Sequence, residues 1–326
     1  MQPQVTVVVP THNRRALLAQ TMRTVLWQRD VDLEVIVVDD GSTDGTKDVV
    51  AAISDPRVRL LRIDAPEGVS VARNLGAAAG QGEWLAFCDD DDLWAPDKLR
   101  DQVAAACDSE RGWVYAGQVN VSINLRVIGG APPLAPDALL RRLPKSNAVP
   151  GGGSGVLLRR DAAPSPLFDT GYRHFADWDL WLRLARSGPP AWVPRPLIGY
   201  RVHPGARSMD TAGMVAELDT IDHRHGGPVD RGVFYRHVAR VSLRADRRRD
   251  ALRYYFQAAA HGSGGGTAVA LGRDLGGLAA DAAVRARRHA GRRWRPWLMP
   301  SPSREPRNAQ HLDWLSQGEA WLRHLR

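Results

Sequence analysis

Cysteine is scarce in this chain of 326 residues, which has only Cys88 and Cys107. Two cysteines can form neither a disulfide scaffold nor a four-cysteine zinc site, so we expect two buried thiols in a reducing compartment. No uninterrupted apolar run reaches membrane-spanning length, and Val5–Val9 follow the N-terminus without a basic start or a cleavage site. These absences predict a cytoplasmic protein and leave peripheral contact with a membrane open.

Positive charge is scarce in the first third of the chain. Residues 1–110 contain 11 Lys and Arg against 19 Asp and Glu, whereas residues 231–326 contain 19 against 7, within a net charge of +8. The sequence pI near 10.0 is typical of nucleic-acid binders. However, the acidic third would repel phosphate unless a metal intervened. We therefore expect no nucleic-acid partner, and we expect different roles for the two ends.

Two common nucleotide-binding signatures are missing. The first predicted strand is followed by Pro10–Asn13 instead of a glycine-rich turn, and the chain has no P-loop pattern. The run Asp89–Asp92 matches the motif of phosphatases with an aspartate nucleophile only in part, because that motif has Thr or Val where this chain has Leu93. These observations argue against a nicotinamide enzyme, a P-loop enzyme and such a phosphatase.

Apolar runs and amphipathic segments alternate along the first hundred residues. The runs at 5–9, 35–38, 58–63 and 84–88 predict strands, the first ended by Pro10, and segments 14–28 and 69–79 predict helices. This alternation predicts an α/β fold with a parallel sheet. Farther on, we expect a helix over 96–106, strands within 114–127, and a loop with a short helical piece over 129–150. We also expect a helical hairpin of segments 234–243 and 248–260, and a last helix over 312–325.

Polar side chains follow three of the predicted strands, at Pro10–Asn13, Asp39–Ser42 and Asp89–Asp92. In open α/β sheets the carboxyl ends of the strands form the ligand crevice. Four adjacent aspartates repel one another unless a cation or hydrogen-bond donors neutralise them. The alternative is a solvated acidic loop, but the run begins directly after a buried strand. We therefore predict a Mg²⁺ or Mn²⁺ site that holds a substrate diphosphate.

Six motifs in order carry a family resemblance over roughly residues 4–205. They are Val7–Arg14, Val37–Asp44, Gly68–Gly76, Phe87–Trp94, Asp177–Ala185 and Tyr200–His203. Together they resemble the successive motifs of family 2 glycosyltransferases with a GT-A fold, which is a Rossmann-like, mostly parallel sheet flanked by helices. The resemblance implies an inverting, metal-dependent glycosyltransferase that uses a nucleotide-diphosphate sugar.

The resemblance also implies roles for individual residues. Asp89, Asp91 and His203 would bind the divalent metal, Mn²⁺ or Mg²⁺. The donor would be a UDP sugar, with dTDP and GDP as alternatives. The residues implied for contact with this nucleotide sugar are Pro10, Thr11, Asn13, Asp39, Asp40, Arg73, Asp89, Asp90 and Arg201.

Asp177 would be the general base that deprotonates the acceptor for a single, inverting displacement. Its alternative role is a helix cap, and we assign the neighbouring Asp179 to structure. Ala176 stands where many members of the family have Glu, which leaves the acceptor class open. Gly152–Ser154 fall where the family shapes its sugar pocket, although a plain loop before a strand explains the glycines equally well.

We predict three parts: residues 1–110 for the nucleotide sugar, 111–230 for the acceptor and the base, and a basic helical extension over 231–326. The extension, with Arg292–Trp297, could contact a membrane, another copy of the chain or an acidic acceptor, or could simply face water. A second hypothesis is an inactive transferase-like protein whose basic region binds membrane or nucleic acid. The acceptor stays open among a growing polysaccharide, a lipid-linked intermediate, a peptide and a small natural product.

Overall fold

The computed structural model describes residues 3–203, 205–263, 272 and 309–326. It divides into two compact units. Unit 1 comprises Met1–His203 and Asn308–Arg326, and unit 2 comprises Pro204–Arg307. The three parts predicted from the sequence, 1–110, 111–230 and 231–326, were assigned by role and stay a prediction. By its contacts the chain divides after His203, and the C-terminal end belongs to unit 1 because buried side chains of the last helix pack on the sheet.

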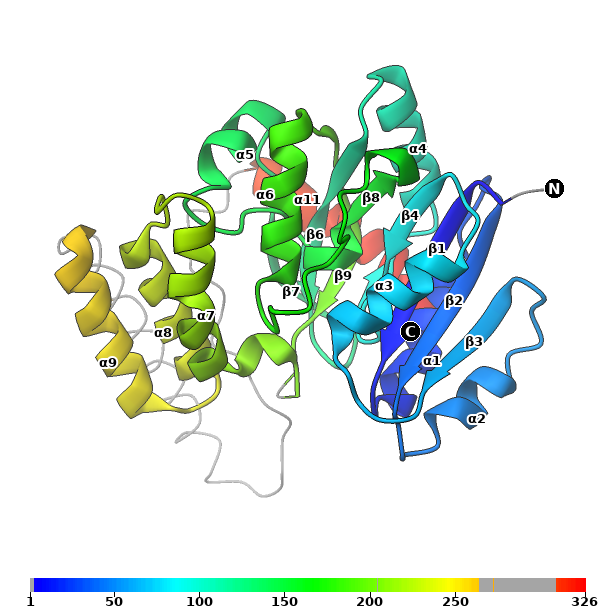
Figure 1. Ribbon diagram of the computed structural model, residues 1–326, viewed down its shortest axis with the longest axis horizontal. Coiled ribbons are helices and arrows are strands. Elements are labelled where there is room, and N and C mark those ends of the chain that lie inside the picture. Colours follow the sequence, from blue (N-terminus) through cyan, green and yellow to red (C-terminus); the bar gives the residue numbers. More distant parts are fainter. Residues whose placement is uncertain (1–2, 204, 264–271, 273–308) are drawn as a thin grey trace. The chain divides into compact units, whose positions relative to one another are not determined.

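Unit 1 is built on one mixed sheet (Figure 1). Its strands are β1 (Val5–Thr11), β2 (Leu33–Asp40), β3 (Val58–Ile63), β4 (Trp84–Phe87), β5 (Leu93–Trp94), β6 (Trp113–Val121), β7 (Val127–Ala131), β8 (Val156–Arg159) and β9 (Ala191–Arg201). The order is β3-β2-β1-β4-β8-β6-β9-β5, with β7 paired to β6. Strands β1 to β4 are parallel to one another, as predicted. Strand β8 is antiparallel to β4 and β6, so the sheet is less uniformly parallel beyond β4.

Helices cover both faces of this sheet. They are α1 (Arg15–Leu26), α2 (Thr46–Ala51), α3 (Val69–Ala79), α4 (Lys98–Asp108), α5 (Pro136–Arg142), α6 (Ala176–Ser187) and α11 (Ala309–Leu322), with the short turns η1 (Gly152–Gly155) and η5 (Arg323–Leu325). Side chains alternate between the faces of a strand. Val7 and Val35 therefore share a core with α1, α4 and α11. On the other face, Val8 and Val38 contact α3 closely enough that a Cβ on Gly76 would clash.

Strand β1 extends two residues beyond the predicted end at Val9, through Pro10 to Thr11. Its pairing with β2 continues to Thr11, opposite Asp39, while its pairing with β4 ends at Val8. Pro10 therefore pairs with β2 only and has no strand on its other side. Its missing N–H does not cost the sheet a hydrogen bond at this position. As a result, Thr11 lies buried at the end of the strand.

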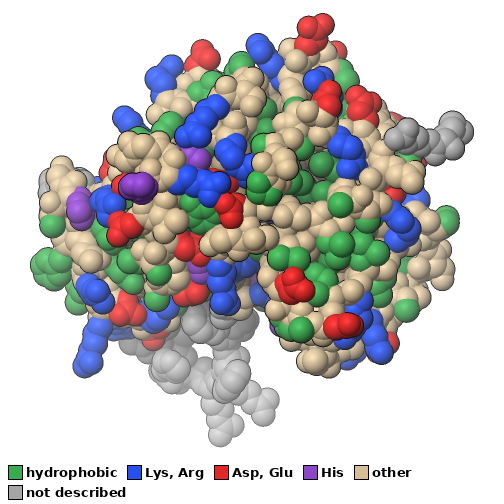
Figure 2. Space-filling view, viewed as in Figure 1, with side chains coloured by type: hydrophobic (Ala, Val, Ile, Leu, Met, Phe, Trp, Pro, Cys, Tyr) green, Lys and Arg blue, Asp and Glu red, His purple; other side chains and the backbone are tan. Residues whose placement is uncertain are grey.

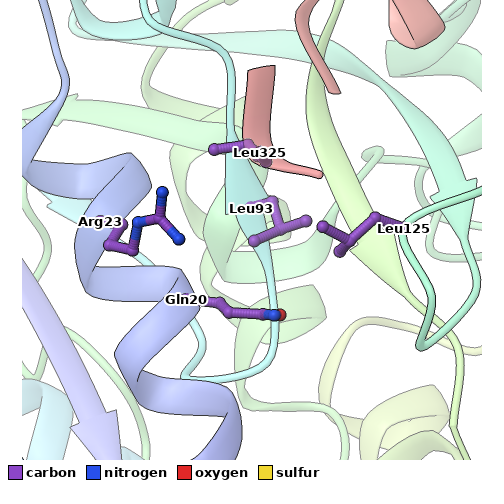
Figure 3. Close-up of a pocket in the computed structure, with 5 residues that line it drawn as sticks. All are labelled: Gln20, Arg23, Leu93, Leu125 and Leu325. Atoms are coloured by element: carbon purple, nitrogen blue, oxygen red, sulfur yellow. The ribbon is translucent and has the colours of Figure 1, made fainter. Parts of the chain in front are cut away.

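Helix α11 packs on the sheet through two tryptophans. Trp314 Nε1 donates to the Gln118 carbonyl at 3.1 Å, and Trp321 Nε1 donates to the Pro196 carbonyl at 2.8 Å. Gly117 leaves room for Trp314, since a Cβ there would lie 2.1 Å from the indole ring. The chain's C-terminal end also borders a small pocket (Figure 3), lined by Gln20, Arg23, Leu93, Leu125 and Leu325. The C-terminal end is therefore part of the core of unit 1.

Replacing Trp314 with alanine is expected to lower the free energy of unfolding by about 3–5 kcal/mol, because it empties a buried indole site. Trp314 is 4% exposed, whereas Leu312 on the same helix is 47% exposed. Leu312→Ala is therefore the control and should cost no more than about 0.5 kcal/mol. Urea unfolding followed by circular dichroism measures both, and equal losses would contradict the packing of α11.

Unit 2 is helical where the structure describes it, with α7 (Thr211–Arg224), α8 (Arg231–Arg244) and α9 (Arg248–Ala258). Helices α8 and α9 form the predicted hairpin, in which Tyr235 stacks on Tyr254 with ring centroids 6.3 Å apart. The side chain of Asp230 accepts the Val233 N–H at the start of α8, a standard cap. Arg292–Trp297 lie outside the described residues.

Two predictions about the surface can be compared with the structure. Cys88 is buried as predicted, but Cys107 is exposed, because it lies on the outer side of α4. Within the described ranges, no helix has both the length and the apolar character needed to cross a membrane. On the face drawn in Figure 2, Lys and Arg side chains are interspersed with Asp and Glu.

Candidate functional site

The loops that follow β1 and β2 are tied together at the carboxyl end of the sheet. Asn13 adopts a left-handed conformation with φ 53°, donates its N–H to Ser42 Oγ at 2.9 Å and accepts the Thr43 N–H at 2.9 Å. His12 Nδ1 lies 2.5 Å from the Asp40 carbonyl oxygen. Asn13 was expected to contact the nucleotide, and that contact stays a prediction. In the structure its side chain joins the two loops.

Asp39 and Asp40 stabilise the neighbouring loops. Asp39 is fully buried and accepts hydrogen bonds from Arg62 Nη1 at 2.7 Å and the Ser42 N–H at 2.9 Å. Asp40 accepts the N–H groups of Glu67 and Gly68 at 2.7 and 2.8 Å. These carboxylates shape the loops over the strand ends, and their contact with a nucleotide stays a prediction.

The four aspartates after β4 turn in different directions. Asp89 lies 2.5 Å from Arg73 Nη2 and donates its N–H to Ser154 Oγ. Asp91 Oδ2 lies 2.9 Å from His203 Nε2, at the end of β9. Asp92 Oδ1 accepts the Arg201 N–H at 3.2 Å. The aspartate run therefore contacts α3 and the end of β9 through its carboxylates, and η1 through the Asp89 N–H.

Burial and mutual repulsion act on this acidic run. Burial, together with the charge of Asp91, raises the pKa of Asp90 to about 7. Burial raises the pKa of Asp92 well above its usual range, with a further contribution from Asp91 and Asp89. Both shifts mean that negative charge is disfavoured here. A bound cation would reverse that penalty.

The side chains present fit a divalent ion in part. Two ligands about 2.1 Å from one ion and at right angles to each other lie about 3 Å apart, close to the 2.9 Å between Asp91 Oδ2 and His203 Nε2. Asp89, the third predicted ligand, turns toward Arg73. No group of three or more His, Cys, Asp or Glu arranged for a metal occurs among the residues that the structure describes. Two protein ligands suffice when substrate phosphates complete the shell, as is usual for Mg²⁺.

Arg201 is the most unusual buried side chain at this edge. It is 1% exposed, and none of its three guanidinium nitrogens has a hydrogen-bond partner in the described part of the chain. Burial lowers its pKa, while Asp92 and Asp91 act in the opposite direction. A buried charge without hydrogen bonds is costly. The arrangement therefore favours an anion with several oxygen acceptors beside the acidic run.

Asp177 lies at the start of α6, across the glycine turn η1 from Arg73. A Cβ on Gly152 would lie 3.0 Å from Asp177 Oδ2, and one on Gly153 would lie 2.8 Å from Arg73 Nη2. Asp177 Oδ1 accepts the Trp178 N–H at 2.7 Å, and Asn147 Nδ2 lies 3.5 Å from Oδ2. The glycines thus let the backbone pass between the predicted base and the arginine that pairs with Asp89. Asp179 is fully buried and pairs with Arg183 at 2.8 Å, consistent with a structural role.

Some residues near the site received no role from the sequence. Asn147 was of this kind, since an amide group in a loop carries no distinctive signal. Ser154 was expected only as part of the Gly152–Ser154 pocket, and the structure adds that its hydroxyl accepts the Asp89 N–H. Arg14 belongs to the first quoted motif, yet only the structure brings its Nη1 to 3.0 Å from His203 Nε2. Lys98 was missed because a lysine at a helix start is ordinary. Its Nζ is buried 3.8 Å from the centre of the Trp94 ring, without a hydrogen-bond partner among the described residues.

Replacing Lys98 with methionine is expected to stabilise the protein by about 1–3 kcal/mol at pH 6, with a smaller gain at pH 10. Burial lowers the pKa of Lys98 to about 7, below the unfolded value of about 10.4. Between these values the unfolded chain binds the extra proton, so the stability of the wild type rises with pH. Urea unfolding at pH 6, 8 and 10 measures the effect. The exposed Lys145 is the control, and a pH-independent difference would contradict a lowered pKa.

The fold and the strand-end carboxylates define an α/β protein of the GT-A class. The chain is similar to S. aureus TarS 1-349 in complex with UDP-GlcNAc, with a TM-score of 0.54 and 16% identity over 82% of this chain and 76% of that one. It is also similar to the mannosyltransferase PcManGT from Pyrobaculum calidifontis in complex with GDP-Man and Mn²⁺, with a TM-score of 0.50 and 19% identity over 100% and 86%.

The comparison of sequences adds the family. Residues 6–164, just under half of the chain, match the model of glycosyl transferase family 2. The chain is 38% identical to the succinoglycan biosynthesis protein ExoO of Rhizobium meliloti over 162 residues, which cover 49% of this chain. The match spans 44% of the length of that relative. The family and fold predictions are confirmed, while the individual site residues stay predictions.

Proposed function

We propose that this protein transfers a sugar from a nucleoside-diphosphate sugar to an acceptor hydroxyl with inversion at the anomeric carbon. The observation that carries the proposal is the buried guanidinium of Arg201, which has no hydrogen-bond partner among the described residues and lies beside the acidic run. A diphosphate offers several oxygens to such a guanidinium, and a divalent ion would offset the aspartates. The named relatives favour this activity over an inactive transferase-like protein.

Asp91 and His203 are the residues that we expect to hold the ion, and diphosphate oxygens would complete its shell. When bound, Mn²⁺ or Mg²⁺ would stabilise the negative charge of the leaving nucleoside diphosphate. Arg201 would bind the same diphosphate from the buried side. Arg73, held against Asp89 and over the ring of Phe168 at 5.0 Å, would approach the nucleotide.

Asp177 is proposed as the general base. The acceptor oxygen forms a bond to the anomeric carbon while the bond from that carbon to the diphosphate oxygen breaks. The bonding electron pair leaves with the nucleoside diphosphate, and the hydroxyl proton passes to the Asp177 carboxylate. Its position across η1 from Arg73 supports a base near the donor but separate from the diphosphate site.

The donor and the acceptor are proposed by class. UDP is the first candidate nucleotide, with dTDP and GDP as alternatives, since the similar structures carry UDP-GlcNAc in one case and GDP-Man with Mn²⁺ in the other. The relative in succinoglycan biosynthesis supports an acceptor in polysaccharide assembly. We propose a cytoplasmic setting, where nucleotide sugars are available, with peripheral membrane contact or self-association through the basic region as further proposals.

Thermal shift with UDP, dTDP and GDP sugars in the presence of Mn²⁺, followed by mass spectrometry of products, tests the activity. We expect one nucleotide to raise the melting temperature in the wild type and much less in Asp91→Asn. Asp219→Asn in unit 2, whose aspartate pairs with Arg231, is the control and should respond like the wild type. Absence of any response that depends on Asp91, together with absence of sugar transfer, would overturn the proposed function.

A further inference from the structure

Arg14 places a positive charge against the two residues expected to bind the metal. Its Nη1 lies 3.0 Å from His203 Nε2 and 3.5 Å from Asp91 Oδ2, and those two atoms lie 2.9 Å apart. Three atoms from three separate parts of the chain therefore meet at one point. The side chain of Arg14 is 24% exposed and that of Asp91 is 17% exposed, so the point is close to solvent.

Ordinary hydrogen bonds cannot satisfy all three contacts at once. An imidazole Nε2 either carries one proton or offers one lone pair. If it donates to Asp91, its N–H lies against the N–H groups of Arg14. If it accepts from Arg14, its lone pair lies against a carboxylate oxygen. In the second arrangement, however, His203 Nε2 and Asp91 Oδ2 both point toward the Arg14 guanidinium, which is the cation that they share.

The backbone of Arg14 holds the side chain in reach of this point. Asn13 is fixed by Ser42 and Thr43, and the Arg14 carbonyl accepts the N–H groups of Leu17 and Leu18 at the start of α1. The base of the side chain is therefore anchored. A guanidinium has no lone pair to offer a metal, so it cannot share the site as a ligand.

We propose that Arg14 is a resident cation at the Asp91–His203 pair, which a divalent ion must displace in order to bind. The inference rests on the proposed function in that it takes Asp91 and His203 as the ligands. Displacement opposes metal binding in the nucleotide-free protein. A bound diphosphate offers the displaced guanidinium a new anion, so metal and nucleotide strengthen each other's binding, and linkage makes this effect reciprocal.

Mn²⁺ binding to the full-length protein without nucleotide, measured by electron paramagnetic resonance of free Mn²⁺, tests the inference. We expect Arg14→Gln to bind Mn²⁺ about tenfold more tightly than the wild type, because a like charge close to the ion is removed. Arg15→Gln is the matched control: its side chain is exposed and bonds the Asp44 carbonyl at 3.3 Å. It should bind Mn²⁺ as the wild type does, and His203→Gln should bind it more weakly.

A second measurement adds UDP. The wild type should gain about tenfold in Mn²⁺ affinity when UDP is present, and Arg14→Gln should gain clearly less. Arg14→Met repeats the test with an apolar side chain, and circular dichroism confirms that each variant is folded. Unchanged or weaker Mn²⁺ binding in both Arg14 variants would overturn the inference, as would Mn²⁺ binding by none of the proteins. Tighter binding in the variants without sugar transfer by the wild type would support the inference and count against the proposed function.

Discussion

Asp177→Asn is expected to lower the rate of sugar transfer about 1000-fold while leaving the affinity for the nucleotide within about twofold. General-base catalysis contributes about 10²–10⁴-fold to a rate, and an amide of the same shape cannot accept the acceptor's proton. Donor binding should survive because Arg201, Asp91 and His203 form their contacts without Asp177. Initial rates at saturating donor, together with calorimetric binding of the nucleoside diphosphate, measure the two quantities.

The control for this prediction is Asp179→Asn, two positions along the same helix. Asp179 pairs with Arg183 at 2.8 Å in a fully buried position, so its loss should reduce stability and leave the turnover of the folded protein close to that of the wild type. A folded Asp177→Asn protein with more than about a tenth of the wild-type turnover would remove Asp177 from the role of base. In that event the remaining rate would come from positioning and charge stabilisation.

Much of the first half of unit 1 could be predicted from the sequence, because its strands are buried on both faces. Such strands appear as continuous runs of valine and isoleucine, as at Val5–Val9 and Val35–Val38, and the helices between them show clear periodicity. The end of β1 could not be predicted, since whether Pro10 stops a strand depends on which neighbour lies beside it. The placement of α11 could not be predicted either, because its partner Gly117 is far away in the sequence.

The candidate site also has a part that could be predicted from the sequence and a part that could not. Asp89–Asp92 could be located because four carboxylates directly after a buried strand are rare and costly. Their individual directions could not be predicted, because they depend on partners such as Arg73 in α3 and Arg201 and His203 at the end of β9. The roles of Asp39 and Asp40 in stabilising the loops could not be predicted either, since their hydrogen-bond donors include the backbone N–H groups of Ser42 and Gly68. The sequence thus indicates which polar side chains lie at the carboxyl edge of the sheet, whereas the packing of distant segments determines which of their atoms are in contact.

Arg201→Met is expected to weaken binding of the nucleoside diphosphate about 100-fold and, in the same protein, to raise the stability of the ligand-free form. Two charge-assisted hydrogen bonds to phosphate oxygens account for the loss of affinity. The gain in stability follows because the guanidinium is buried and has no hydrogen-bond partner in the part of the chain that the structure describes. An apolar side chain of similar length removes that penalty and should stabilise by about 1–3 kcal/mol.

The opposite signs of these two effects make the test of Arg201 selective. Arg195→Met on the same strand is the control, since Arg195 is half exposed and pairs with Asp101 on α4. It should change neither quantity by more than a small amount. Urea unfolding and calorimetric nucleotide binding on the three proteins give the result. If Arg201→Met lowered stability as well as affinity, Arg201 would be a structural residue, and the buried charge would not be a site kept for an anionic substrate.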